Sequence, residues 1–196
     1  SVLLPLIIFY TFRFFPLIFS TPNFLNTMIP LSMSLIFIFI YLSFNTTNIK
    51  SIISYLAFSQ VSIIFYIFCL KEYHAAMFYF ITLSLSITML YLSIGYVVSK
   101  FNNISNVKVM GGIIFKMPSM FLFTLIAFLS TSGVPFFSGF YSHEVIISTF
   151  YNSDQAILVP SILIGISASF LISYVFLKNI ILIFLGKNKG NIHEFN

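Results

Sequence analysis

The sequence predicts an all-α polytopic membrane protein with about six transmembrane helices. Hydrophobic residues make up 59% of the chain and charged residues only 7%, and the mean hydropathy of +1.06 is far above that of soluble domains. The apolar residues are gathered in long stretches, and about 20 apolar residues are needed for a helix to cross a bilayer. A soluble globular domain is therefore excluded.

Six stretches have the composition of membrane-spanning helices, and short clusters of Ser, Thr, Asn and Pro separate several of them, as is typical of loops. The stretches lie at residues 2–19, 27–44, 51–70, 75–98, 117–148 and 157–186. The last two are longer than a bilayer requires, because the fifth is interrupted and the sixth can tilt or extend past the lipid. We expect one transmembrane domain over residues 1–186 and a polar tail over residues 187–196.

The distribution of lysines predicts the orientation of the chain. With six spans, one side of the membrane receives Lys50, Lys100, Lys108, Lys116, Lys187 and Lys189. The opposite loops hold only Lys71, Glu72 and Asp154. By the positive-inside rule the lysine-rich side is the cytoplasm or the matrix, and both termini lie there. One span more or fewer would scramble this segregation, so the charges support the count of six.

The residue types that the chain lacks exclude several kinds of ligand. The single cysteine, Cys69, provides neither a disulfide framework nor a cysteine metal site. No cluster of His, Cys, Asp and Glu has metal-ligand spacing, no glycine-rich nucleotide motif occurs, and no histidine pair is placed to bind haem. The nine basic residues are spread between apolar segments, which argues against a nucleic-acid partner. We expect lipid as a partner, and no metal, nucleotide or redox cofactor.

The fifth stretch is broken by Gly133, Pro135 and Gly139 and then carries His143 and Glu144. Proline removes a helical hydrogen bond and glycine permits non-helical backbone, so we expect two half-helices joined inside the membrane. Inside a membrane, the backbone polar groups that such a break sets free must be satisfied by neighbouring helices or by water in a cavity. Ionisable groups at this depth are typical of ion or proton pathways. The alternative interpretation places both groups at the water interface, after the helix has ended.

Hydroxyl side chains follow the helical period of the fourth stretch. Ser84 and Thr88 lie four residues apart, with further hydroxyls beside them. With Tyr141, they are candidates to hold water near the ionisable pair. Small and hydroxyl residues at helical spacing also let helices pack closely, and this alternative stays open.

Several motifs in a fixed order resemble a known family. Residues 48–60 read NIKSIISYLAFSQ, residues 108–112 read KVMGG, and residues 116–118 read KMP. Followed by GVP and SGFYSHE within residues 133–144, this order resembles the antiporter-like subunits of respiratory complex I, which are related to the Mrp sodium/proton antiporters. The resemblance covers almost the whole chain. Within the family, the motifs resemble NADH-ubiquinone oxidoreductase chain 2 slightly more than chain 5, which stays as the alternative.

The resemblance implies the second half of an antiporter-like subunit, from about its eighth to its thirteenth helix, in the mitochondrial inner membrane. It implies that His143 occupies the position of the family's key Lys or Glu in the second broken helix, and Glu144 that of the acid that often follows. The central lysine of the family's eighth helix would fall near Leu4 or Pro5 and is absent. In the eleventh helix, hydroxyls stand where chain 5 has a His/Lys series.

The implied function is that of a membrane-arm subunit of complex I. It would contribute to proton translocation coupled to electron transfer from NADH to ubiquinone, with no redox chemistry on this chain. The implied partners are other membrane-arm subunits, including a chain that supplies the missing N-terminal half, as expected for the C-terminal portion of a split subunit. Two alternatives stay open: a non-conducting scaffold subunit of the same complex, and a component of a cation/proton antiporter.

Overall fold

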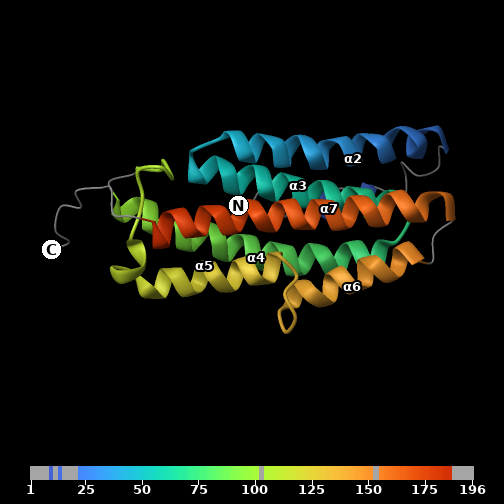
Figure 1. Cartoon of the computed structure of the whole chain (residues 1–196). Helices are drawn as coiled ribbons and strands as arrows, with labels where there is room; N and C mark the ends of the chain where they lie inside the picture. The colour runs from blue at the N-terminus through green and yellow to red at the C-terminus, as the bar shows by residue number, and fades with distance from the viewer. Residues whose placement is uncertain (1–8, 11–12, 15–21, 102–103, 152–154, 187–196) are drawn as a thin grey trace.

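The computed structural model is a bundle of long helices aligned side by side (Figure 1). The structure describes residues 9–10, 13–14, 22–101, 104–151 and 155–186. The elements are α2 (Pro22–Asn45), α3 (Ile49–Cys69), α4 (Tyr73–Lys100), the 3-10 turn η1 (Ile113–Phe115), α5 (Pro118–Thr131), α6 (Ser138–Tyr151), α7 (Gln155–Ile180) and the π-helical turn η2 (Ile181–Leu185). The predicted all-α fold is confirmed.

Four of the described helical segments are long and apolar enough to cross a membrane. They are Thr27–Asn45, Ile49–Cys69, Tyr73–Lys100 and Ile162–Leu185, and each overlaps one predicted stretch. The fifth predicted stretch corresponds to α5 and α6, of which α5 is apolar but too short to cross alone. Nearly all of the first stretch, 2–19, and the whole tail, 187–196, lie outside the described residues. The chain is a multi-pass membrane protein.

Helix α3 lies at the centre of the bundle. In its apolar span 78% of the residues are buried, against 22% for α2 and 39% for the last span. It contacts α2, α4 and α7, as is possible for a helix that is apolar on all sides. Its first turn is capped by Asn48, whose side-chain oxygen accepts a hydrogen bond from the backbone nitrogen of Lys50 at 3.1 Å.

The lysines gather at one end of the bundle. The connection between α2 and α3 pairs with the loop after α4, because Val107 donates its backbone N–H to the carbonyl of Thr47 at 2.9 Å. The helix ends and loops at this end of Figure 1 carry Lys50, Lys100, Lys108 and Lys116. The connection between α3 and α4, with Lys71 and Glu72, lies at the opposite end. Lys187, Lys189 and Asp154 lie outside the described residues.

Helix α5 stops at a Schellman motif. Gly133 adopts the left-handed conformation with φ of 72° and donates its N–H to the carbonyl of Ser130 at 3.3 Å, while Val134 donates to the carbonyl of Leu129 at 3.1 Å. Such a cap requires a residue without a Cβ penalty at the left-handed position, and proline often follows it. Gly133 and Pro135 thus end α5 by a well-defined local structure, and the fifth stretch is discontinuous as predicted.

The second half-helix, α6, returns to pack against the end of α5 at Gly139. A Cβ atom on this glycine would overlap the carbonyl oxygen of Ser130, so only glycine allows the two backbones to come this close. The hydroxyl oxygens of Ser130 and Ser138 lie 3.1 Å apart at the same contact. Gly139 therefore fixes how the two half-helices meet.

We expect Gly139→Ala to lower the free energy of unfolding by about 1–3 kcal/mol, the usual cost of overpacking, even though alanine favours helix over glycine. The matched control is Gly95→Ala in α4, where a Cβ would meet nothing within 4 Å and where the substitution is expected to be neutral or stabilising. Thermal unfolding of the detergent-solubilised protein, followed by circular dichroism, measures both. Equal effects of the two substitutions would contradict the close contact.

Candidate functional site

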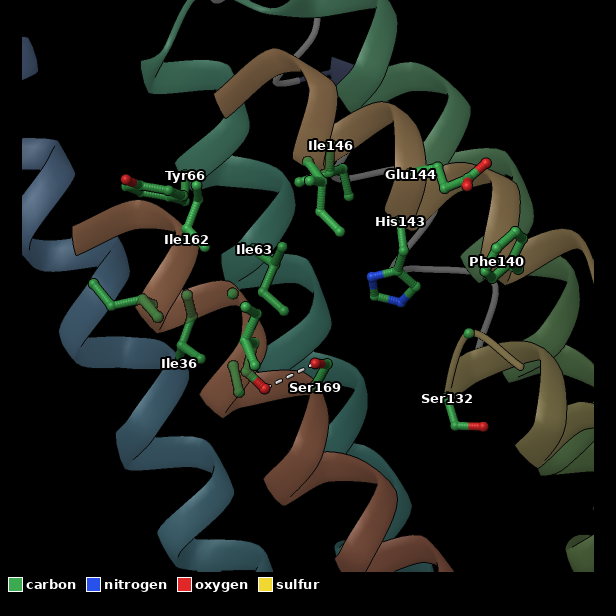
Figure 2. A pocket seen from close by; sticks show the side chains of 16 residues that line it. Ile36, Ile63, Tyr66, Ser132, Phe140, His143, Glu144, Ile146, Ile162 and Ser169 are labelled. Carbon is green, nitrogen blue, oxygen red and sulfur yellow. Dashed lines mark hydrogen bonds between the residues drawn. The ribbon is translucent and has the colours of Figure 1, made fainter. Parts of the chain in front are cut away.

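A cavity of about 320 Å³ lies between α2, α3, α6, α7 and the break that follows α5 (Figure 2). Its walls are mainly isoleucine side chains from α2, α3, α6 and α7. The polar side chains that line it are Tyr66, Ser132, His143, Glu144 and Ser169. The described part of the cavity wall contains no lysine or arginine.

The imidazole of His143 points from α6 into this cavity (Figure 2). Its Nε2 atom is buried and has no hydrogen-bond partner among the described residues. A buried polar atom without a partner costs about 1–3 kcal/mol, and in proteins such atoms are commonly satisfied by ordered water. Because roughly 10–15 Å³ suffices for one water molecule, the cavity of about 320 Å³ that His143 lines has room for a small cluster of water molecules.

The break leaves the imidazole of His143 beside the cap of α5. The cap uses the carbonyls of Phe128, Leu129 and Ser130, and a Cβ atom at Gly133 would lie 2.8 Å from the imidazole Cδ2. The imidazole thus packs against the interrupted backbone.

A tyrosine from α4 lies against the same imidazole. The rings of Tyr79 and His143 meet edge to face, with centroids 5.3 Å apart and an interplanar angle of 65°. The Tyr79 hydroxyl donates a hydrogen bond to Oε1 of Gln60 in α3. Both side chains are buried, each only 3% exposed. This contact joins α3, α4 and α6 around the imidazole.

A second polar contact holds α6 on α4. The hydroxyl of Thr82 donates to Oγ of Ser142 at 3.2 Å, and Ser142 in turn donates to the carbonyl of Gly139 at 2.9 Å. Thr82 and Ser142 are both buried. Tyr79 and Thr82 are three residues apart and therefore share one face of α4, which is the face that meets α6.

The structure does not bring the hydroxyls of Ser84 and Thr88 to His143. Ser84 and Thr88 lie two and six residues beyond Thr82, which is about 200° and 240° around the helix from the face that meets α6. Their hydroxyls donate to the carbonyls of Ile81 and Leu85, at 2.8 and 2.9 Å, within their own helix. Their part in holding water stays a prediction.

The remaining predicted residues lie around the break in different ways. The carboxylate of Glu144 points away from the imidazole in Figure 2, and Glu144 is an exposed residue. Tyr141 is also exposed and stacks edge to face on Phe140. Gly133 lies against His143, since a Cβ there would be 2.8 Å from the imidazole Cδ2. Of Glu144, Tyr141 and Gly133, only Gly133 therefore lies against the imidazole.

Sequence reasoning did not assign Gln60 and Tyr79 to this site. The available signal for Gln60 was that it is the only amide side chain in α3, whose residues after Lys50 are otherwise apolar or carry hydroxyls. For Tyr79 it was the spacing with Thr82 and Ser86, at i, i+3 and i+7, which marks one helix face. The face that carries Ser84 and Thr88 also shows hydroxyl side chains at helical spacing, so the sequence does not indicate which of the two faces packs against α6.

Comparison with known proteins identifies the family. Residues 1–183 match the model described as NADH:quinone oxidoreductase/Mrp antiporter, transmembrane. The chain belongs to this family. The fold of long apolar helices with one break also agrees with the resemblance that the motifs indicated.

Several curated relatives are similar to part of the chain. NADH-quinone oxidoreductase subunit L of Rickettsia typhi is 34% identical over 119 residues, which are 61% of this chain and 18% of the relative. NADH-ubiquinone oxidoreductase chain 5 of Lycodon semicarinatus is 38% identical over 98 residues, 48% of this chain and 17% of the relative. Chain 5 of Dictyostelium discoideum is 29% identical over 131 residues, 64% of this chain and 20% of the relative.

The matched part of the chain spans about a fifth of the length of these relatives. The expected family is confirmed. Of the two chains that the resemblance named, these three relatives bear the name of chain 5 or subunit L, and none of the three bears that of chain 2.

We expect Tyr79→Phe and Gln60→Leu each to lower the free energy of unfolding by about 0.6–2 kcal/mol, the range for hydrogen bonds between membrane helices. Each leaves a buried polar atom unpaired, so the double variant should cost less than the sum of the two. A double-mutant cycle of thermal unfolding measures this. Tyr96→Phe, at an exposed tyrosine of α4, is the control, and strictly additive single effects would show that the bond does not form.

Proposed function

We propose that this chain is part of the membrane arm of mitochondrial complex I and contributes to proton translocation coupled to electron transfer from NADH to ubiquinone. Its family membership supports the proposal, as do relatives that are named as subunits of NADH:quinone oxidoreductases. The electron transfer itself takes place elsewhere in the complex. The contribution of this chain is a change in protonation inside the membrane.

The observation that carries the proposal is the imidazole of His143, which lines a cavity inside the bundle and whose buried Nε2 atom lacks a partner among the described residues. Histidine is the side chain that most readily exchanges protons near neutral pH. An ionisable group inside a membrane bundle is by default a candidate for a proton pathway. Protonation of such a group changes the local charge, and this change can bias the hydration or the packing of neighbouring elements.

The proposed orientation follows from the lysine-rich end of the bundle. By the positive-inside rule this end faces the matrix of the mitochondrial inner membrane, and both termini belong on the same side. The proposed partners are lipid, other membrane-arm subunits, and a chain that supplies the N-terminal half of the antiporter-like unit. Large apolar side chains that point outward, such as Leu85, Leu92 and Phe136, suit contacts with either lipid or protein.

His143→Gln in the assembled complex is expected to lower the ratio of protons translocated to electrons transferred, because glutamine retains hydrogen bonding but cannot take up the proton. The measurement is the proton-to-electron ratio in sealed vesicles with NADH and ubiquinone. His143→Ala should have the same effect. A ratio equal to that of the wild type in both variants, with normal assembly, would rule out the conducting role.

A second candidate function is that of a non-conducting scaffold in the same complex. Two observations favour it: no lysine lines the described part of the cavity, and the hydroxyls of Ser84 and Thr88 are bonded within their own helix. A scaffold would be required for assembly of the membrane arm and insensitive to point substitutions at His143. Copurification with a quinone-reducing assembly separates both candidates from a component of a free cation/proton antiporter.

The other predicted proton-path residues provide a contrasting set of variants. We expect Glu144→Gln, Ser84→Ala, Thr88→Ala and Tyr141→Phe to leave the proton-to-electron ratio at the wild-type value, because Glu144 and Tyr141 are exposed and the hydroxyls of Ser84 and Thr88 are bonded within their own helix. The same vesicle measurement tests them beside His143→Gln. A loss as large as that of His143→Gln in any of the four would assign that residue to the pathway.

A further inference from the structure

We propose that the outer face of α5 and α6, centred on the connection between them, is a docking surface for a transmembrane helix of an adjoining subunit. The proposal rests on the proposed function in that the partner is another subunit of the membrane arm. The exposed apolar side chains that define this surface are Leu122, Ile126, Phe136 and Val145. We call it the α5–α6 face.

The connection between α5 and α6 projects from the edge of the bundle (Figure 1). Phe136 within it is 94% exposed, and the neighbouring Pro135 is exposed as well. The backbone of Phe136 is left-handed, with φ of 76°, a conformation that bulky residues rarely adopt. The centre of the α5–α6 face is thus an outward aromatic ring on irregular backbone.

This connection lies near the middle of the membrane. Helices α5 and α6 have 14 residues each, which is about 21 Å of helical rise on either side of the connection. Gly139, just after the connection, lines a small pocket together with Ser86, and Ser86 is at the middle of α4 (Tyr73–Lys100). Because the hydrocarbon layer is about 30 Å thick, a connection at this level is inside it.

The backbone of the connection has polar groups that the bundle does not pair. Phe137 donates its N–H to the carbonyl of Val134 at 3.2 Å, and Phe140 donates to the carbonyl of Phe137 at 3.1 Å. Among the described residues, no turn or loop hydrogen bond uses the N–H of Phe136 or the carbonyls of Pro135 and Phe136. Lipid chains cannot pair these groups, and unpaired groups in hydrocarbon are costly.

A carboxylate borders the same face. Glu144 lies six residues beyond Ser138, the first residue of α6, which is about 9 Å further along the helix. Like its neighbour Val145, it is exposed. Ionisable side chains within membrane segments almost always face protein or a water-filled cavity and are paired there. The charge of Glu144 is therefore a second reason why lipid does not suit this side of α6.

A transmembrane helix satisfies both demands of the α5–α6 face. Its apolar side chains cover the ring of Phe136, which water would leave exposed. Hydroxyl or amide side chains at the middle of the membrane pair the free backbone groups, since such side chains form hydrogen bonds between membrane helices. A basic or amide side chain further along the helix complements Glu144. The partner is thus a helix with polar side chains at these two levels.

The experiment attaches a benzophenone label to Phe136→Cys in the assembled complex and identifies the photoadducts by mass spectrometry. The native Cys69 is buried, and the wild-type complex treated in the same way accounts for any reaction there. We expect the main adduct to join position 136 to a transmembrane peptide of another subunit. Ile126→Cys, on the same face, provides the same test if Phe136→Cys prevents assembly.

Several outcomes of the labelling would overturn the proposal. They are adducts with phospholipid alone, with residues 1–21 of this chain, or with a second copy of the chain. Rapid reaction of Phe136→Cys with a membrane-impermeant maleimide would place the connection in water and would overturn it too. Phe115→Cys is the control for that reaction, because Phe115 is 92% exposed at the lysine-rich end and should react rapidly.

Removal of the ring tests its contribution to docking. Phe136→Gly takes away the ring, and glycine accommodates the left-handed backbone, so the connection itself is not destabilised. We expect the ratio of bound to free neighbouring subunit in detergent, measured on native gels, to fall by about thirtyfold, as for a typical aromatic hot spot. Phe115→Ala should leave this ratio unchanged. Full retention of the neighbour in Phe136→Gly would contradict the proposal.

The same samples separate this proposal from the proposed function. If the label joins position 136 to a transmembrane peptide while His143→Gln leaves the proton-to-electron ratio unchanged, the conducting role fails and the docking surface stands. If His143→Gln lowers that ratio while position 136 yields adducts with lipid alone, the conducting role stands and the docking surface fails.

Discussion

The hydrocarbon core of a bilayer offers no water to a backbone group that a helix break sets free. At the end of α5 this constraint is met by a Schellman motif built on Gly133, which pairs the carbonyls of Leu129 and Ser130. The imidazole of His143 packs against the same glycine.

The arrangement of the site follows from this break. The imidazole of His143 lines the cavity, and its buried Nε2 atom has no hydrogen-bond partner among the described residues. The same geometry needs α6 to lie close to α5, which Gly139 allows because a side chain there would meet the carbonyl of Ser130. The contact between Thr82 and Ser142 then holds α6 against α4 at the height of the imidazole.

Most of the fold could be predicted from the sequence, whereas the site could be predicted only in part. The apolar stretches gave the helices, and the glycines and proline gave the position of the break, because these are local properties of the chain. The prediction chose Ser84 and Thr88 on α4, yet the face that meets α6 carries Tyr79 and Thr82. Apolar residues surround α4 on all sides, so its sequence contains no strong signal for the face that packs inward.

The sequence by itself determined the class of protein, the lengths of its helices, the break near Gly133 and the segregation of lysines to one end. It could do so because a bilayer demands apolar helices with satisfied backbone groups, and each segment meets this demand separately. Only the tertiary structure decided that the imidazole of His143 points into the cavity while the carboxylate of Glu144 points away from that imidazole. That outcome depends on how far each helix is rotated about its own axis, and the rotation is fixed by contacts between helices that are far apart in the sequence.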